Sequence, residues 1–141
     1  MKRIIHVVSI DAPRNEVFSA ITTGQGLSSW WSTRVDASEH VGGKVHFTFT
    51  GDFHPVMEVT EMKDNWSVAW KCVAGHVPWQ DNTFAFFLED SDGRVRLTFN
   101  QEYANELSDV EYGIYNFNWG YYLNSLKQYC ETGRGTPFVA E

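Results

Sequence analysis

The sequence is poor in cysteine and in long apolar runs, and each absence excludes a class of protein. Only Cys72 and Cys130 occur among 141 residues, at a spacing that matches no metal-binding or redox motif, so we expect two buried free thiols. No apolar run reaches the roughly 18 residues that a membrane-spanning helix needs. Near the N-terminus, polar residues interrupt the apolar run, which favours a strand over a signal peptide. We therefore expect a cytoplasmic protein without membrane insertion.

Positive charge is also scarce. The chain carries 11 Lys and Arg against 18 Asp and Glu, which gives a formal net charge of −7. It has no basic cluster that could neutralise phosphates, so we expect no nucleic-acid partner. It also has no internal repeat and no linker-like run of Ser, Gly and Pro. Together with the length, this indicates a single domain over residues 1–141.

Recognisable catalytic motifs are missing. None of the five His residues forms an HxH or HExxH pair, and the sequence contains no GxSxG, P-loop or dinucleotide-binding motif. We therefore expect no metal, no cofactor and no assignable catalytic residue. The His of most interest is His76, which stands close to Pro78 and Trp79 in a long loop. It could act as an acid or base at the mouth of a pocket, and the alternative is a solvent-exposed loop His.

Aromatic residues are abundant, at 16% with six Trp. Many fall in the stretch 109–131, where apolar residues recur at steps of three and four, the spacing of one helical face. Such a helix spans roughly 33 Å, about the diameter of a small domain. The Gly-containing segment TGRGTP then ends it. The face consists of Tyr112, Tyr115, Trp119, Tyr122, Leu123, Leu126 and Cys130.

The rest of the chain reads mainly as strands. We expect strands at 3–10, 44–50, 55–62, 67–73, 83–89 and 94–100, and short helices at 13–23 and 25–31, the first capped by Asp11. Apolar residues that alternate with polar ones, such as Val95, Leu97 and Phe99, predict one buried face, and short connections between strands predict antiparallel pairing. Segments 33–40 and 74–81 are longer than hairpins need. The predicted fold is therefore α+β: a curved antiparallel sheet of six or seven strands around a long C-terminal helix, with two short helices after the first strand.

Four segments carry a resemblance to a known superfamily. They are Ile10–Pro13 with Val17-Phe18, Leu27–Trp31, Val41–Lys44, and the spaced series Trp119, Tyr122, Leu123, Leu126, Lys127, Tyr129, Glu131, Gly133, Gly135 and Pro137. Through the order and spacing of these segments, the chain resembles the START-like (SRPBCC) superfamily with the helix-grip fold. It is most similar to the branch of homologues of the activator of heat-shock-protein-90 ATPase. The resemblance covers about residues 4–138. Independently of it, a pocket between a helix and a curved sheet is a common ligand location, so we expect a cavity there.

The function that we expect is binding of a small hydrophobic or aromatic molecule in that cavity, without catalysis. One alternative is a cyclase- or dehydratase-like enzyme that uses the same cavity. A second is a protein-interaction module similar to a chaperone co-factor. The protein is expected to be a monomer or a homodimer. The candidate ligand-binding residues are Trp30, Trp70, His76, Trp79, Phe84, Tyr115, Trp119 and Tyr122.

Overall fold

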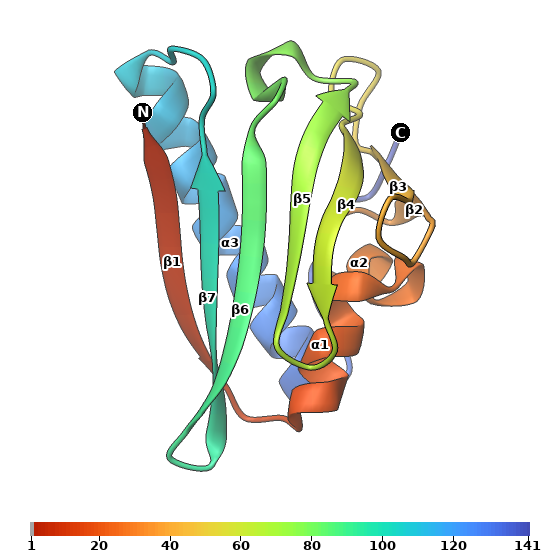
Figure 1. Cartoon of the computed structure of the whole chain (residues 1–141), viewed down its shortest axis with the longest axis vertical. Helices are drawn as coiled ribbons and strands as arrows, with labels where there is room; N and C mark the ends of the chain where they lie inside the picture. The colour runs from red at the N-terminus through yellow and green to blue at the C-terminus, as the bar shows by residue number, and fades with distance from the viewer. Residues whose placement is uncertain (1) are drawn as a thin grey trace.

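A computed structural model describes residues 2–141 as one seven-stranded antiparallel sheet with a long helix lying across one of its faces (Figure 1). The strand order is β1-β7-β6-β5-β4-β3-β2. The predicted helix-grip fold is confirmed. In chain order the elements are β1 (Arg3–Ile10), α1 (Arg14–Thr22), α2 (Gly24–Trp30), β2 (Arg34–Ala37), β3 (Lys44–Thr48), β4 (Val56–Lys63), β5 (Ser67–Ala74), the 3₁₀ turn η1 (Val77–Trp79), β6 (Thr83–Ser91), β7 (Arg94–Glu102) and α3 (Asp109–Thr132).

The inner face of the sheet follows the alternation of the sequence. Val95, Leu97 and Phe99 of β7 are buried, and the residues between them are exposed or half-buried. Strand β4 is less regular because its pairing with β5 shifts register at two places. Such irregularities bend a strand and increase its twist, which helps the sheet to curve. The expected long connection 33–40 contains the short strand β2, which pairs with β3 at the sheet edge.

Helix α3 is capped at both ends. At the start, the Ser108 hydroxyl accepts a hydrogen bond from the Glu111 backbone N–H at 3.1 Å. Acidic residues in this first turn favour the positive end of the helix dipole. At the end, Gly133 adopts the left-handed conformation with φ 85° and donates its N–H to the Tyr129 carbonyl at 2.8 Å. The expected stop after residue 131 is therefore confirmed.

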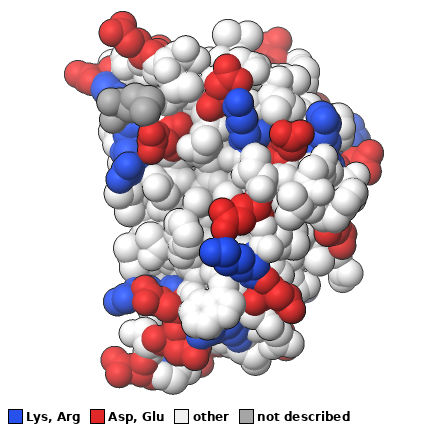
Figure 2. Space-filling model, viewed as in Figure 1, with Lys and Arg blue, Asp and Glu red and all other residues white. Residues whose placement is uncertain are grey.

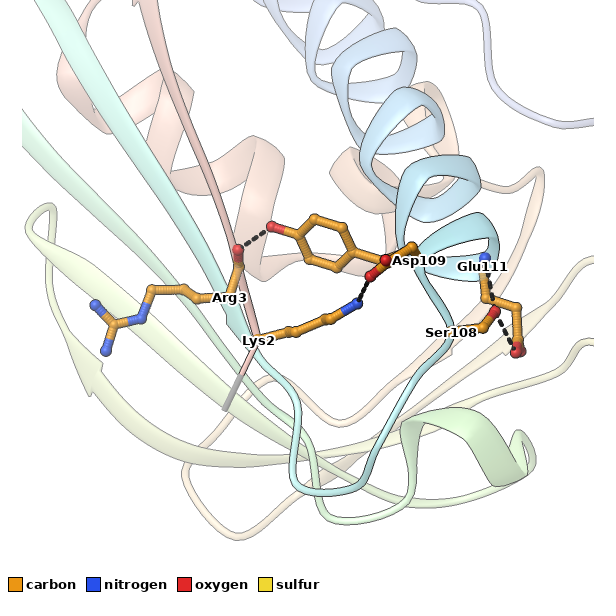
Figure 3. Close-up of polar contacts among 6 residues, drawn as sticks. Lys2, Arg3, Ser108, Asp109 and Glu111 are labelled. Carbon is orange, nitrogen blue, oxygen red and sulfur yellow. Dashed lines mark hydrogen bonds and ion pairs between the residues drawn. The ribbon is translucent and has the colours of Figure 1, made fainter.

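The first turn of α3 is tied to β1, as Figure 3 shows. The Tyr112 hydroxyl donates to the Arg3 carbonyl, and the Lys2 ammonium pairs with the Asp109 carboxylate. The Lys2 ammonium lowers the pKa of the exposed Asp109 carboxyl through this hydrogen bond and its charge. These contacts fix where the helix starts relative to the strand at one edge of the sheet.

The prediction that Asp11 caps the first short helix is wrong. Pro13, not Asp11, is the N-cap residue of α1, and α1 has no side-chain cap hydrogen bond. The Asp11 backbone N–H instead donates to a Glu131 carboxylate oxygen at 2.8 Å. Lys127 also donates to Glu131 at 3.0 Å, so this carboxylate joins the β1–α1 junction to the last turns of α3.

The far end of α3 is joined to α2 and to the C-terminal tail through one buried hydroxyl. Ser125 is fully buried, donates to the Trp30 carbonyl at 2.8 Å and accepts from the Thr136 N–H at 2.7 Å. The tail then continues beside Trp31, where Phe138 exchanges backbone hydrogen bonds with Trp31 and Thr33. No helix within residues 2–141 has both the length and the apolar character needed to cross a membrane.

We expect the substitution Ser125→Ala to destabilise the fold, because it leaves the Trp30 carbonyl and the Thr136 N–H without their buried partner. Loss of a buried hydrogen-bond partner costs about 1–3 kcal/mol of unfolding free energy. Urea unfolding followed by circular dichroism measures this cost. The control Ser38→Ala removes an exposed hydroxyl. Equal stability of the two variants would contradict the role given to Ser125.

Candidate functional site

A pocket of about 400 Å³ opens between α3, the end of β3 and the loop that follows β5. The protein also has a larger surface hollow of about 680 Å³ beside the loop before α3, but most of the residues that line it are exposed. The smaller pocket reaches into the aromatic core and is the better candidate site. Its purely aromatic wall consists of Trp31, Phe49, Phe53, Trp79, Trp119 and Phe138, and its polar groups belong to Thr50, His76, Tyr115, Asn118 and Tyr122.

Three indole rings form the wall of this pocket that faces the core. Trp31, Trp79 and Trp119 are each almost fully buried. The ring centroids of Trp31 and Trp119 lie 4.9 Å apart, and Trp79 lies 6.2 Å from both. The planes of the Trp79 ring and the other two differ by only 22° and 18°. The rings therefore form a group of nearly aligned flat faces.

The orientation of this wall is set by polar groups behind it. The Trp119 indole N–H donates to the Gln101 side-chain oxygen at 2.7 Å, inside the core. The Tyr103 hydroxyl lies near Trp79 and Gln101, and burial raises the pKa of Tyr103 well above its ordinary value, so the hydroxyl stays protonated. Within residues 2–141 this hydroxyl, the Trp79 N–H and the Gln101 amide nitrogen make no hydrogen bond of good geometry.

The main polar pair of the pocket is His76 with Tyr115. The His76 Nε2 atom and the Tyr115 hydroxyl oxygen are 2.9 Å apart. Burial lowers the pKa of His76, and the positive charge of nearby His54 adds to this effect. Burial also raises the pKa of Tyr115, with a further contribution from the Glu111 carboxylate. Both groups are therefore neutral near pH 7, and the pair can offer one donor and one acceptor.

The loop that carries His76 depends on Gly75. Its φ of +86° is rarely adopted by residues with a side chain. A Cβ atom at this position would also lie 2.0 Å from the His54 carbonyl oxygen, far inside contact distance. Gly75 therefore lets the chain leave β5 sharply and place His76 against Phe53 and Trp79, whose ring centroids lie 4.6 and 5.3 Å from the imidazole.

Five of the predicted site residues line the pocket. They are His76, Trp79, Tyr115, Trp119 and Tyr122. The other three, Trp30, Trp70 and Phe84, lie in the core behind it. Trp30 illustrates the difference, because its indole N–H donates to the Ala20 carbonyl at 2.8 Å and joins α2 to α1.

Sequence reasoning missed six lining residues. Phe49 had a usable signal, since it continues the inward alternation of Val45 and Phe47. For Trp31 the signal was ambiguous, because the residue sits at the end of α2, where helical periodicity does not decide which of two adjacent Trp faces inward. The others come from turns, from the outer edge of α3 and from the tail, where no periodic pattern exists. The six are Trp31, Phe49, Thr50, Phe53, Asn118 and Phe138.

The described residues do not point to metal or thiol chemistry. Within residues 2–141, no group of three or more His, Cys, Asp and Glu side chains is placed to hold a metal ion. Cys72 and Cys130 are free, the first buried and the second half-buried. Burial raises the pKa of Cys130 to about 12 and that of Cys72 above its ordinary value, so both thiols are protonated and weakly nucleophilic.

We expect stability to fall as the pH drops below the ordinary His pKa of 6.5, because folding lowers the pKa of His76. In that range the unfolded chain binds the proton first, which favours unfolding. The variant His76→Gln lacks this contribution and should lose less stability between about pH 7 and pH 5. Urea unfolding at the two pH values measures the difference. Equal losses in both proteins would show that His76 is not buried as described.

Comparison with known proteins places the chain in a family. Residues 11–131 match the family described as Activator of Hsp90 ATPase homolog 1-like protein. The Aha1 dimer from Colwellia psychrerythraea is similar in structure, with 28% identity, a TM-score of 0.85, and coverage of 96% of this chain and all of the other. DynU16, from the dynemicin biosynthetic locus, has 18% identity and a TM-score of 0.79 over 96% of this chain and 49% of its own.

CalU16 from Micromonospora echinospora is 16% identical, with a TM-score of 0.74 over 93% of this chain and 77% of its own. At such identities the similarity to DynU16 and to CalU16 shows the fold alone. No curated protein matches the chain in sequence. The family match covers most of the chain and agrees with the helix-grip architecture. The chain therefore belongs to the family of Activator of Hsp90 ATPase homolog 1-like proteins, within the START-like (SRPBCC) superfamily.

Proposed function

We propose that this protein binds a small, flat, hydrophobic molecule in the pocket between α3 and the sheet. The observation that carries the proposal is the wall of three nearly aligned indole rings, Trp31, Trp79 and Trp119. Aromatic faces favour offset stacking with another planar ring, and the contact removes apolar surface from water. The volume of about 400 Å³ lies at the lower end of the range for ligand sites, about 300–1,000 Å³, which favours a molecule of about two rings.

The polar groups of the pocket would orient this molecule. His76 and Tyr115 form a neutral pair, and Thr50 and Asn118 lie on the same lining. Among residues 2–141, no carboxylate or ammonium group lines the pocket, which favours a neutral ligand with one or two oxygen atoms over a charged one. Specificity would then come from a few hydrogen bonds in an otherwise aromatic site.

An enzymatic role of the cyclase or dehydratase type is the second candidate, and the His76–Tyr115 pair is what favours it. A neutral imidazole and a phenol at 2.9 Å can pass one proton between a substrate oxygen and the ring nitrogen. DynU16 comes from a biosynthetic locus, and its fold is similar. Binding without catalysis remains the first choice, because the described pocket holds no carboxylate that could act as a second acid or base.

Two further properties are proposed for the chain as a whole. The first is a single domain over residues 1–141, supported by the one hydrophobic core that the sheet and helices share. The second is self-association. It is suggested by the similar protein from C. psychrerythraea, which is a dimer and is covered over its full length.

Native mass spectrometry of the protein purified from its own host tests ligand binding most directly. We expect a retained species whose mass identifies a neutral aromatic or acyl compound. Because a ligand can be lost in purification, a titration with 2-naphthol, followed by tryptophan fluorescence, provides the second measurement. Quenching is expected, since three of the six Trp residues line the pocket.

A matched pair of variants tests whether 2-naphthol binds in the pocket. Asn118→Trp adds a bulky ring at the pocket rim on α3 and should weaken 2-naphthol binding by at least about tenfold, or about 1.4 kcal/mol. Asn124→Trp adds the same ring at an exposed position of α3 outside the pocket and should leave binding unchanged. The proposal fails if neither variant changes the affinity, or if wild-type protein binds no such probe and carries no ligand from its host.

A further inference from the structure

Helix α3 has a second apolar face that points away from the core. Val110, Ile114, Phe117 and Tyr121 are 73, 54, 75 and 51% exposed. Their steps of four, three and four residues place them on one stripe of the helix. At about 100° per residue, this stripe lies opposite the buried Trp119 and Leu123. We call these four residues the outer stripe.

The outer stripe is unusual because it is also free of charge. No Lys, Arg, Asp or Glu occurs between Tyr112 and Leu126, although the chain carries 29 of them, 11 basic and 18 acidic. The solvent side of a surface helix is normally polar and charged. A contiguous exposed apolar strip of this kind indicates a contact surface.

We propose that the outer stripe packs against the outer stripe of a second copy of this chain, with the two α3 helices antiparallel. A symmetric dimer requires a self-complementary surface, and a stripe of apolar side chains without charge meets this condition. Each copy has a net charge of −7, so two copies repel each other wherever charged surfaces meet. The uncharged stripe is a place where that repulsion is smallest.

The ends of α3 select the antiparallel arrangement. Its first turn is acidic, with Asp109 and Glu111, whereas Lys127 and Glu131 near its other end pair with each other at 3.0 Å and cancel in charge. A parallel pair would bring the acidic turns of both copies together. A two-fold axis beside Phe117 instead keeps the two acidic turns at opposite ends of the interface, each beside the uncharged or charge-balanced part of the other helix. Opposite helix dipoles then also lie side by side.

The size of the stripe limits the strength of the dimer. Four side chains on each copy cover less than the roughly 800 Å² per partner that stable interfaces bury. The dimer is therefore expected to form at high protein concentration and to dissociate on dilution. This interface rests on the self-association proposed above and does not depend on the proposed ligand, although it lies next to the pocket. The Tyr121 ring centroid lies 4.9 Å from that of Tyr122, which lines the pocket, so a second copy would border the pocket rim.

The outer face of the sheet is the competing apolar surface. Ile5, Val7 and Phe87 are 52, 60 and 51% exposed, and Val7, Thr98 and Phe87 are paired across β1, β7 and β6. Exposed ion pairs lie on both sides of this patch, Arg3–Glu102 at one end and Arg96–Glu89 at the other. Figure 2 shows this face, where charged side chains lie above and below an uncharged area on the left. A second copy placed here would meet those charges, so this patch serves as the control.

Sedimentation velocity over a wide range of protein concentration tests the proposal, with the variants Phe117→Ser and Phe87→Ser as a matched pair of exposed Phe positions. We expect wild type to shift from monomer to dimer as the concentration rises. Phe117→Ser should weaken the dimer at least tenfold, and Phe87→Ser should leave it unchanged. Thermal unfolding of both variants verifies that they fold.

Cross-linking tests the antiparallel geometry separately. With the two-fold axis beside Phe117, the variant Phe117→Cys should form a disulfide-linked dimer under mild oxidation. The variant Val110→Cys should not, because the two copies of that position lie at opposite ends of the interface. A wild type that stays monomeric at every concentration overturns the proposal, as does dimer loss in Phe87→Ser alone or equal cross-linking of both Cys variants. None of these measurements needs a ligand, so they can fail or succeed independently of the proposed ligand binding. A wild type that stays monomeric would also overturn the proposed self-association, whereas a wild-type dimer that Phe117→Ser does not weaken would overturn the outer stripe alone.

Discussion

The contact between Trp119 and the sheet is the interaction on which the rest of the structure depends. Its ring centroid lies 4.1 Å from that of Phe99 on β7 and 4.9 Å from that of Trp31 after α2. Its N–H reaches Gln101 on the same strand as Phe99. One side chain therefore fixes the distance of α3 from the sheet, the rotation of α3 about its axis and the position of the chain after the short helices. A large indole at this point holds helix and sheet apart, and the space beside it becomes the pocket.

The two ends of α3 explain why the pocket lies where it does. One end is tied to β1 through Tyr112, and the other is tied to α2 through Ser125 (Figures 1 and 3). The helix packs closely against β1, α1 and α2. It therefore covers the sheet less closely toward β3, where the loop after β5 and the C-terminal tail supply His76 and Phe138 instead. Loops and tails pack with more irregular surfaces than helices, and the open volume remains at that junction.

Sequence periodicity predicted the architecture well because each element buries one face. The alternation of β7 and the helical spacing around Trp119 both follow from that burial. Each of the six predicted strands lies within about two residues of its observed bounds, the usual scatter of such assignments, and the short edge strand β2 was missed. The site was predicted only in part. Trp30, Trp70 and Phe84 carry the same aromatic signal as true lining residues, and composition does not separate a core ring from a pocket ring. Phe138 could not be found, because its position follows from the backbone pairing of the tail with Trp31.

Helix α3 shows most clearly where periodicity stops being informative. Its apolar residues occupy two opposite faces, so the sequence pattern alone allows either face to point inward. The choice is made by shape: Trp119, Leu123 and Leu126 reach into the space under the sheet, and the helix presents Ser125 to the Trp30 carbonyl on that same side. Because this face packs against the sheet, Ile114 and Phe117 must point outward, whatever their hydrophobicity. An exposed apolar surface carries a solubility cost that no contact within residues 2–141 offsets. The outer stripe is therefore better explained by a contact between copies than by the fold of a single chain.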